Sequence, residues 1–255
     1  YGDKVLVALS GGADSVCLLT VLCELKNSLG IEEIAAAHLN HGLRETAQRD
    51  TDFCENLCKD KNVRFFKKYV DIKEFAKNIK TCEEDAGRIA RYSFFEELKE
   101  KYGYNKIATA HNMNDRAETF LMRVLSGSSL EGLSGIKPVR EDKVIRPLID
   151  TKRNEIEEYL SDLSQGFMTD ETNFKDVYKR NSLRLNLIPY IEKNYNPNAI
   201  ETFAAMSENL LRDAEYLRNK VKEISKDIRF PAKLCDLPEE PSALIRVISD
   251  KLDTA

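Results

Sequence analysis

The sequence lacks the features of a membrane protein and of a cysteine-bound metal site. No apolar run reaches the roughly 18–20 residues that a membrane-spanning helix needs. No charged start followed by an apolar stretch opens the chain, so neither a membrane partner nor a signal peptide is expected. None of the six cysteines forms Cys-x-x-Cys, and Cys54 and Cys58 have no matching His or Cys pair elsewhere. We therefore expect reduced thiols in a cytoplasmic protein, not a zinc or iron–sulfur site.

A strong positive charge is also missing. The 255 residues carry a net charge of −4, with 32% charged and 42% hydrophobic residues, a balance typical of a globular protein. This charge does not by itself indicate a nucleic-acid-binding protein, although a local basic face is enough to bind RNA. The length suits one large domain, or one domain with a smaller appendage.

Short apolar runs alternate with segments of helical periodicity through the first part of the chain. The apolar runs predict strands at residues 4–9, 34–39, 63–70, 106–110 and, as an edge strand, 144–147. The periodic segments predict helices at residues 16–25, 46–61, 83–102, 113–125 and 151–163. We expect Gly103 to end the third of these helices as a C-cap, and Thr151 to cap the start of the fifth.

This alternation predicts an α/β fold. Residues 1–186 are expected to form a Rossmann-like parallel sheet with helices on both faces. Apolar residues recur at helical spacing between residues 200 and 221, and residues 243–252 have the pattern of a last helix, so residues 187–255 are predicted to form a small helical domain. Ligands of parallel sheets bind at the carboxyl ends of the strands.

A Ser-Gly-Gly-Ala-Asp-Ser segment follows the first predicted strand and leads into a helix. Its two glycines let the backbone turn sharply and bring N–H groups close to an anion, and the helix start adds the positive end of its dipole. The serines can donate hydrogen bonds, and the aspartate suits Mg²⁺ better than it suits a phosphate. We therefore predict an ATP-binding phosphate loop formed by Ser10, Gly11, Gly12, Ala13, Asp14 and Ser15.

The alternative for the phosphate loop is an ordinary strand-to-helix turn, since such turns favour Gly, Asp and Ser. Neither a Walker motif nor a Gly-x-Gly-x-x-Gly dinucleotide motif is present. The whole string resembles the Ser-Gly-Gly-x-Asp-Ser signature of the PP-loop ATP pyrophosphatase superfamily. That resemblance implies cleavage of ATP between its α and β phosphates, transfer of AMP to a carbonyl oxygen and departure of pyrophosphate.

A second motif, His38-Leu-Asn-His41-Gly-Leu-Arg44, follows the second strand. Its two histidines fit either a metal pair, for which no further ligands stand out, or a polar loop. The string resembles the His-x-Asn-His-x-Leu-Arg element of the lysidine synthetases, a family within the PP-loop superfamily. This resemblance implies that His38 lies at the nucleotide and that His41 and Arg44 contact tRNA.

The predicted helix over residues 83–102 carries two arginines, Arg88 and Arg91. Glu84 and Arg88 stand at i and i+4, where an intrahelical ion pair is the simplest interpretation. The arginines could instead reach phosphates from one helix face. The segment resembles the Glu-x-x-x-Arg-x-x-Arg-Tyr helix of the lysidine synthetases, which implies that Arg88 binds ATP and Arg91 neutralises charge as pyrophosphate leaves.

The segment after the fourth predicted strand is rich in acids. Asp115 and Glu118 face the same side of a helix start, where they could share Mg²⁺ with Asp14 or only favour the helix dipole. The segment resembles the family pattern His-His/Asn-x-x-Asp-Gln-x-Glu-Thr, with Arg116 in place of the usual Gln. The resemblance implies that Asp14 and Asp115 hold the metal, that His111 shuttles a proton, and that Asp115 and Glu118 seat the substrate amine.

Three further stretches extend the resemblance along the chain. The glycine-rich residues 121–136 are similar to a family element, as are Asp-Glu-Thr-Asn at residues 170–173 and the following Arg180-Asn-Ser-Leu-Arg184. The alternative for the last two stretches is a solvated basic turn. The functional interpretation is that Arg180 and Arg184 contact the phosphates of tRNA.

The lysidine synthetase resemblance implies a complete reaction. ATP would adenylate the C2 oxygen of wobble cytidine 34 in the CAU anticodon of tRNA(Ile), and free L-lysine would then displace AMP to form a carbon–nitrogen bond. ATP and Mg²⁺ are the expected cofactors. The cytidine must be unstacked to enter a pocket, which a single-stranded anticodon loop makes easier. The C-terminal tRNA-binding domain of the family would be absent or truncated.

Two other functions remain as alternatives. Another PP-loop enzyme, such as a tRNA thiolase, would use catalytic or cluster cysteines near the loop; Cys17 lies there, but no Cys-x-x-Cys occurs. A nucleotide-binding module without catalysis would not need Asp115, Glu118 or the basic region around Arg180 and Arg184. The sequence does not decide the oligomeric state, and a homodimer is one alternative.

Overall fold

The computed structural model describes residues 2–42, 47–140, 143–169 and 179–226, together with Ala243, Arg246 and Val247. Arg44, the motif at residues 170–173 and most of the last predicted helix lie outside these residues. Within the described ranges, no helix combines the length and the apolar character needed to cross a membrane.

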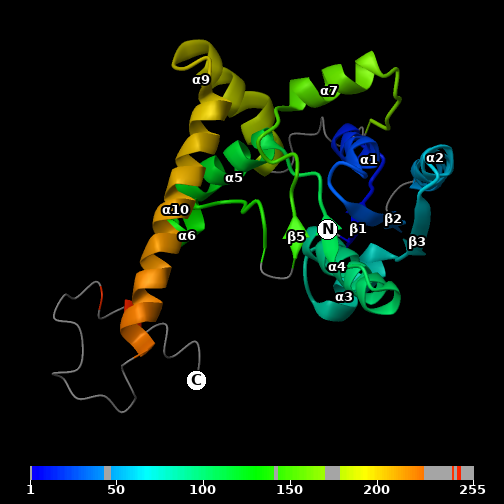
Figure 1. Ribbon diagram of the computed structural model, residues 1–255. Helices are drawn as coiled ribbons and strands as arrows, with labels where there is room; N and C mark the ends of the chain where they lie inside the picture. Colours follow the sequence, from blue (N-terminus) through cyan, green and yellow to red (C-terminus); the bar gives the residue numbers. More distant parts are fainter. Residues whose placement is uncertain are drawn as a thin grey trace.

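A five-stranded parallel sheet forms one part of the molecule (Figure 1). Its strands are β1 (Asp3–Ala8), β2 (Ile31–Asn40), β3 (Arg64–Tyr69), β4 (Lys106–Ala108) and β5 (Val144–Ile145). They lie in the order β3-β2-β1-β4-β5, and each neighbouring pair is parallel. The five strands predicted from the sequence are confirmed, including the edge position of β5.

Helices cover both faces of this sheet, as predicted. On one face lie α1 (Ala13–Leu25), α2 (Ala47–Asp60) and α7 (Arg153–Asp162), and on the other lie α3 (Ile72–Ile79) and α4 (Glu83–Tyr102). The alternation of side chains along β1 explains the two layers: Val5 and Val7 enter the first core, and Leu6 enters the second. The α/β fold with a parallel sheet is therefore confirmed.

The strand order creates a topological switch point between β1 and β4. The chain runs outwards from β1 through β2 to β3, and then returns to the other side of β1 as β4. Loops leave the two central strands in opposite directions at such a point, which opens a crevice at their carboxyl ends. The fold thus brings the phosphate loop after β1 close to the acidic segment after β4.

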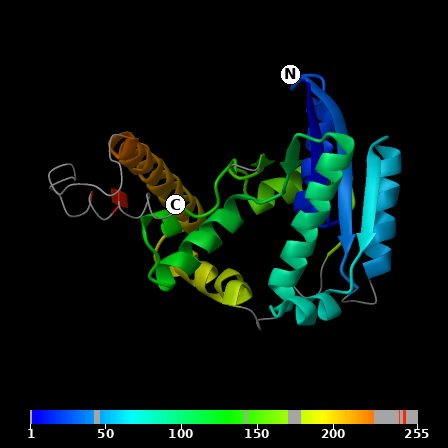
Figure 2. The ribbon, with the colours of Figure 1, turned by 90° about the horizontal axis from the view of Figure 1, so that it is seen from below.

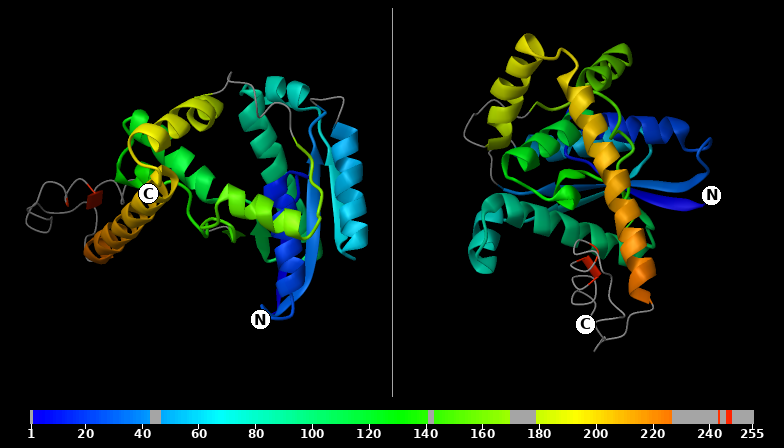
Figure 3. Two further views of the ribbon diagram at one scale, coloured as in Figure 1. Left: turned by 90° about the horizontal axis from the view of Figure 1, so that it is seen from above. Right: turned by 90° about the vertical axis from the view of Figure 1, so that its left-hand side faces the viewer.

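A second part of the molecule is helical (Figure 2). It comprises α5 (Met113–Leu125), α6 (Leu130–Leu133), α8 (Lys179–Ser182), the π-helix η2 (Leu183–Leu187), α9 (Ile188–Asn194) and α10 (Ala199–Lys226). Leu121, Leu183 and Ile188 form its buried cluster. The long α10 runs along α5 and α6 (Figure 3). A domain boundary at residue 186 remains a prediction, and α5, which precedes it, packs on α10.

A buried arginine links the two parts. Arg116 of α5 is only 2% exposed. Its Nη1 donates to Asp150 Oδ1 at 2.8 Å and lies 3.7 Å from Glu208 Oε2 on α10. Arg116 therefore connects α5 both to the segment before α7 and to α10.

Two local features differ from the sequence predictions. Helix α3 is absent from them; Asp71 caps it by accepting the N–H three residues further on, over 3.1 Å. Helix α7 begins at Arg153, so Thr151 is not its cap, because the Thr151 N–H closes a turn onto the Leu148 carbonyl at 3.0 Å. Gly103 does end α4, with a φ of 75° in the left-handed region, as predicted.

Candidate active site

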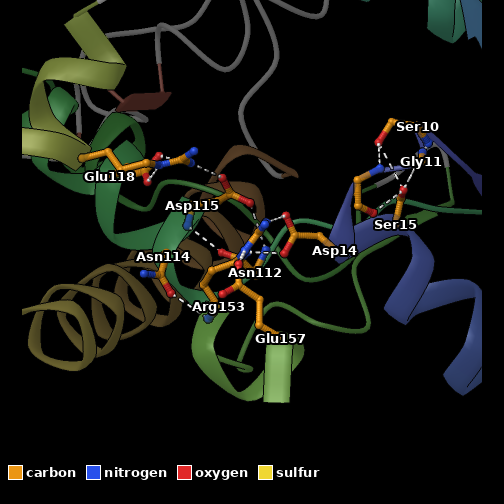
Figure 4. A network of polar contacts seen from close by, with 12 residues as sticks. Ser10, Gly11, Asp14, Ser15, Asn112, Asn114, Asp115, Glu118, Arg153 and Glu157 are labelled. Atoms are coloured by element: carbon orange, nitrogen blue, oxygen red, sulfur yellow. Dashed lines mark hydrogen bonds and ion pairs between the residues drawn. The ribbon is translucent and has the colours of Figure 1, made fainter. Parts of the chain in front are cut away.

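The phosphate loop folds around the hydroxyl of Ser15 (Figure 4). The N–H groups of Ser10 and Gly11 donate to Ser15 Oγ, each at 3.1 Å, and this hydroxyl donates to the Gly12 carbonyl at 3.0 Å. Gly12 is the N-cap of α1, and no side chain caps the helix start. The first N–H groups of α1, beginning with that of Ala13, are therefore available to an anion.

Gly11 occupies a position that a larger residue would strain. Its φ is +92°, a conformation that residues with a side chain rarely adopt. A Cβ on Gly11 would lie 3.3 Å from Cys54 Sγ and 3.5 Å from Met168 Cγ. The Gly11 carbonyl also accepts the Met168 N–H at 2.9 Å. The hydrogen bond from Met168 thus helps to fix the shape of the phosphate loop. The positive φ of Gly11 and the closeness of Cys54 require glycine at this position.

Asn112 joins the phosphate loop to the start of α5 (Figure 4). Its Nδ2 donates to Asp14 Oδ1 at 2.9 Å. Its Oδ1 accepts the Asp115 N–H at 3.0 Å, while Asp115 Oδ2 accepts the Asn112 N–H at 3.1 Å, which makes a capping box. The two acids predicted to hold the metal, Asp14 and Asp115, therefore meet on either side of one amide side chain.

Arg153 also reaches Asp14, although it was not among the residues predicted from the sequence. It is the first residue of α7, and its Nη1 forms an ion pair with Asp14 Oδ2. Its Nε donates to Glu157 Oε1 at 2.6 Å, and its N–H donates to Asn114 Oδ1 at 3.0 Å. A cation in the first turn of a helix opposes the helix dipole. This unfavourable placement is the one feature of the sequence which indicates that Arg153 pairs with a residue outside its own helix.

Glu118 is almost fully buried and is neutralised by two arginines. Its side chain is 1% exposed, and it accepts Arg180 Nε at 2.8 Å and Arg184 Nε at 2.6 Å. Nη2 of each arginine also lies near Asp115 Oδ1, at 2.8 Å for Arg180 and 3.5 Å for Arg184. The arginine side chains remain 38% and 41% exposed. Their predicted contacts with tRNA remain predictions, and the structure adds acidic partners for both.

Two ionisable groups of the crevice have shifted pKa values because they are buried. Burial raises the pKa of Asp14, the positive charge of Arg153 opposes this rise, and the negative charge of Asp115 adds to it. Burial lowers the pKa of His111 to about 4, with Asp115 opposing the shift. His111 is therefore neutral at pH 7, and its imidazole is close enough to interact with the charge of Asp115 on α5.

His38 is buried beside the end of β1. Its Nδ1 hydrogen-bonds the Leu9 carbonyl at 2.9 Å, and its Nε2 lies 3.1 Å from Thr51 Oγ1. Because a carbonyl only accepts, Nδ1 carries the proton of the neutral ring. Burial lowers the pKa of His38. Both ring nitrogens thus hold β1 to α2, and roles for His38 at the nucleotide and for His41 at tRNA remain predictions.

The two arginines of α4 are exposed. The guanidinium of Arg88 lies 5.9 Å from the centre of the Tyr92 ring. Burial lowers the pKa of His38 and of His111, and the charge of Arg91 adds to this effect at both. The positive charge of Arg91 therefore acts on side chains at the carboxyl ends of β2 and β4. The phosphate-binding roles of Arg88 and Arg91 remain predictions.

Three thiols near the phosphate loop are buried and protonated. Burial raises the pKa of Cys17 to about 11 and the pKa of Cys54 and of Cys58 to about 12. Nucleophilic and metal-binding cysteines instead need a lowered pKa. In the parts of the chain that the structure describes, no three His, Cys, Asp or Glu side chains group as a metal site.

Asp14 and Asp115 nevertheless fit Mg²⁺ bound together with a nucleotide. This ion keeps several water ligands and commonly uses one or two carboxylates plus phosphate oxygens. The charge of Asp115 raises the pKa of Asp14, so the two carboxylates repel each other and an added cation would be favourable. The donor set suits the ion, and the metal site remains a prediction.

The family model and the curated relatives that match this chain indicate the same family. A family model described as a PP-loop domain matches residues 2–191. The tRNA(Ile)-lysidine synthase of Clostridium perfringens is 48% identical over 96% of this chain and 51% of its own length. That of Petrotoga mobilis is 37% identical over 88% of this chain and 72% of its own length. The chain spans about half the length of the first curated relatives that it matches.

A solved structure shares the fold. The U34-tRNA thiolase of Methanococcus maripaludis superimposes with a TM-score of 0.66, covering 82% of this chain and 72% of its own. Its sequence is only 20% identical, so this likeness concerns the fold and not the reaction.

Proposed function

The chain belongs to the PP-loop family and, within it, to the tRNA(Ile)-lysidine synthases, and from this membership we propose that it makes lysidine in tRNA(Ile). The C2 oxygen of wobble cytidine 34 attacks the α-phosphorus of ATP, and pyrophosphate leaves. An amine of free L-lysine then attacks C2, loses one proton and displaces AMP. The observation that carries the proposal is that the uncapped start of α1, which includes Asp14, is linked through Asn112 to Asp115 at the start of α5.

The phosphate loop supports the binding of ATP. The N–H groups at the start of α1 have no capping side chain, and the helix dipole favours a negative charge there. Ser10 Oγ lies 3.1 Å from Ser15 Oγ on the same loop and can donate to a phosphate oxygen. Ser15 Oγ accepts the N–H groups of Ser10 and Gly11 and donates to the Gly12 carbonyl, so its proposed role is to hold the loop in shape.

Asp14 and Asp115 are the proposed ligands of Mg²⁺, which would neutralise charge on the departing pyrophosphate. Asn112 fixes both carboxylates, so the two acids are in place before the nucleotide binds. Arg91 adds a positive charge from α4, as its effect on His38 and His111 indicates.

The amine of free lysine must be neutral when it attacks. Asp115 is the proposed seat for this amine, because Glu118 is 1% exposed and already accepts Arg180 and Arg184. Glu118 then acts chiefly by holding the two arginines in place. His111 is neutral at pH 7 and is the proposed acceptor of the amine proton, although burial lowers its pKa to about 4 and so makes it a weak base.

The tRNA is proposed to approach over α8 and η2. Arg180 and Arg184 keep about 40% of their side chains exposed while one edge of each pairs with the acids. The outer N–H groups can therefore contact phosphates of the anticodon loop. The cytoplasm, where tRNA is modified, is the proposed location.

A thiolase is the second candidate in the same superfamily, and its chemistry does not match the thiols here. Cys17, Cys54 and Cys58 all have raised pKa values, which disfavours a nucleophilic or cluster-binding role. A module that only binds nucleotide would not need a buried acid such as Glu118 held by two arginines.

The deciding experiment incubates the protein with labelled lysine, ATP, Mg²⁺ and unmodified tRNA(Ile), and then analyses the nucleosides. Labelled lysidine at position 34 is the expected product, and Asp14→Ala should abolish pyrophosphate release that depends on lysine and tRNA. Sulfur in the tRNA would favour the thiolase. ATP binding without any exchange between pyrophosphate and ATP would favour the non-catalytic module.

A further inference from the structure

Arg153 contacts the starts of two other helices, α5 and α1. Its backbone N–H donates to Asn114 Oδ1 at 3.0 Å, which fixes the start of α7 to the start of α5. Its guanidinium spans from Glu157, on its own helix, to Asp14, beside the phosphate loop (Figure 4). The charged end of Arg153 therefore lies at the positive end of α1, where a bound triphosphate is expected.

The side chains around this guanidinium carry one excess negative charge when no ligand is bound. Arg153 pairs with Asp14 and Glu157, and Arg180 and Arg184 pair with Asp115 and Glu118, while Asn112 joins the two groups. A divalent cation on the acids would turn this into one excess positive charge. The β and γ phosphates of ATP supply the matching negative charge, so the network suits a metal–nucleotide complex better than either component alone.

We propose that Arg153 is a phosphate-binding residue that exchanges partners during the reaction. Without nucleotide, its guanidinium neutralises Asp14; when Asp14 binds the metal, Arg153 turns to the β and γ phosphates and stabilises the pyrophosphate as it leaves. This inference rests on the proposed use of ATP and assigns a group that acts on the leaving side of the α-phosphorus.

The exchange of partners requires little free energy. The Arg153 and Asp14 side chains are 39% and 25% exposed, and ion pairs that solvent reaches contribute little to stability. A guanidinium matches the oxygens of a phosphate through two parallel hydrogen bonds, which makes pyrophosphate a stronger partner than one carboxylate oxygen. The backbone bond to Asn114 keeps the residue in place while the side chain moves.

The test measures binding by calorimetry for wild type, Arg153→Ala and Arg153→Lys. Affinity for magnesium pyrophosphate should fall by about tenfold or more in Arg153→Ala and by less in Arg153→Lys. AMP, which lacks the β and γ phosphates, should bind all three proteins equally. Without nucleotide, Mg²⁺ should bind Arg153→Ala more tightly, because its competitor at Asp14 is gone.

Two controls separate this role from a structural one. Arg218→Ala removes a half-buried arginine of α10 that pairs with Glu131 of α6 at 3.5 Å, and pyrophosphate affinity should not change. Glu157→Gln loosens the tether but keeps the guanidinium, so pyrophosphate should bind as tightly as in wild type. A general loss of folding in Arg153→Ala would weaken AMP, pyrophosphate and Mg²⁺ together, and such a result would overturn the inference.

Different results would refute the role of Arg153 and the proposed function. If wild type and Arg153→Ala bind magnesium pyrophosphate equally, the role of Arg153 is refuted while ATP chemistry stands. If wild type binds neither ATP nor pyrophosphate, the proposed function fails first.

Discussion

The side chain of Asn112 donates to Asp14 across 2.9 Å, and this one hydrogen bond connects two segments that lie 98 positions apart in the sequence. Asn112 is also the N-cap of α5, where it forms a capping box with Asp115. A single buried amide therefore controls the start of a helix and the separation of two acids. The amide oxygen caps the helix and the amide nitrogen binds Asp14, so a substitution that keeps only the oxygen can separate the two functions.

Asn112→Ala should lose both functions. Removing an N-cap costs about 1–2 kcal/mol of unfolding free energy, and Asp14 loses its neutral partner, so ATP affinity should fall as well. Asn112→Asp keeps an oxygen that accepts the Asp115 N–H, so stability should change less, while a new negative charge next to Asp14 should still weaken ATP binding at fixed Mg²⁺. Urea unfolding and nucleotide titration measure the two effects. Equal stability losses in the two variants would refute the separation.

Gly11→Ala should damage the phosphate loop. A side chain at a φ of +92° costs about 1–2 kcal/mol, and the new Cβ would crowd Cys54 at 3.3 Å. Thermal unfolding should occur at a lower temperature, and ATP affinity should fall. Gly166→Ala is the matched control, since a Cβ at Gly166 meets nothing within 4 Å. A Gly11→Ala protein that binds ATP like wild type would contradict the assignment of the loop.

Glu118→Gln should be destabilising although it changes few atoms. The carboxylate is 1% exposed and holds Arg180 and Arg184, so its neutralisation leaves the two guanidiniums to share the single charge of Asp115. Because both arginines remain partly exposed to water, we expect a loss of about 1–3 kcal/mol in unfolding free energy. Glu131→Gln is the control: its acid is 54% exposed and 3.5 Å from Arg218, and its loss should cost under about 0.5 kcal/mol.

His111 should make the protein less stable in mild acid. Its pKa is about 4 in the folded protein and near 6.5 when unfolded, so between these values the unfolded chain binds more protons. The contribution of a neutral His111 is complete above pH 6.5 and is lost as the pH falls towards 4. Relative to His111→Gln, wild type should therefore lose about 2 kcal/mol between pH 7.5 and pH 5. Unfolding at pH 7.5, 6 and 5 measures the difference, and parallel curves for the two proteins would disprove it.

The sheet and the phosphate loop were predictable because their signals are local. Apolar runs mark β1 to β4, and two glycines before a helix identify the loop without any knowledge of the rest of the chain. The meeting of Asp14 and Asp115 also followed, since both come after strands whose carboxyl ends share one edge of a sheet.

Other parts of the site depend on contacts between distant segments. Arg153 reaches Asp14 only because α7 returns beside α1, and no spacing within the sequence indicates that contact. Arg184 lies in a π-helix, a rare conformation without a simple sequence signal. The burial of Glu118 likewise requires α8 and η2 to cover α5, so its arginine partners could not be assigned from helical spacing alone.

The linkage through Arg116 limits how the chain can be divided. Its guanidinium, 2% exposed, bonds to Asp150 and lies within 3.7 Å of Glu208 on α10, and Phe120 on the same helix lies 6.0 Å, between ring centres, from Phe203. A fragment that ended before α10 would expose the side chains of Arg116 and Phe120 on α5 to water. Expression of the nucleotide-binding half alone should therefore yield aggregating protein, and co-expression with a separate peptide spanning α10 should restore it.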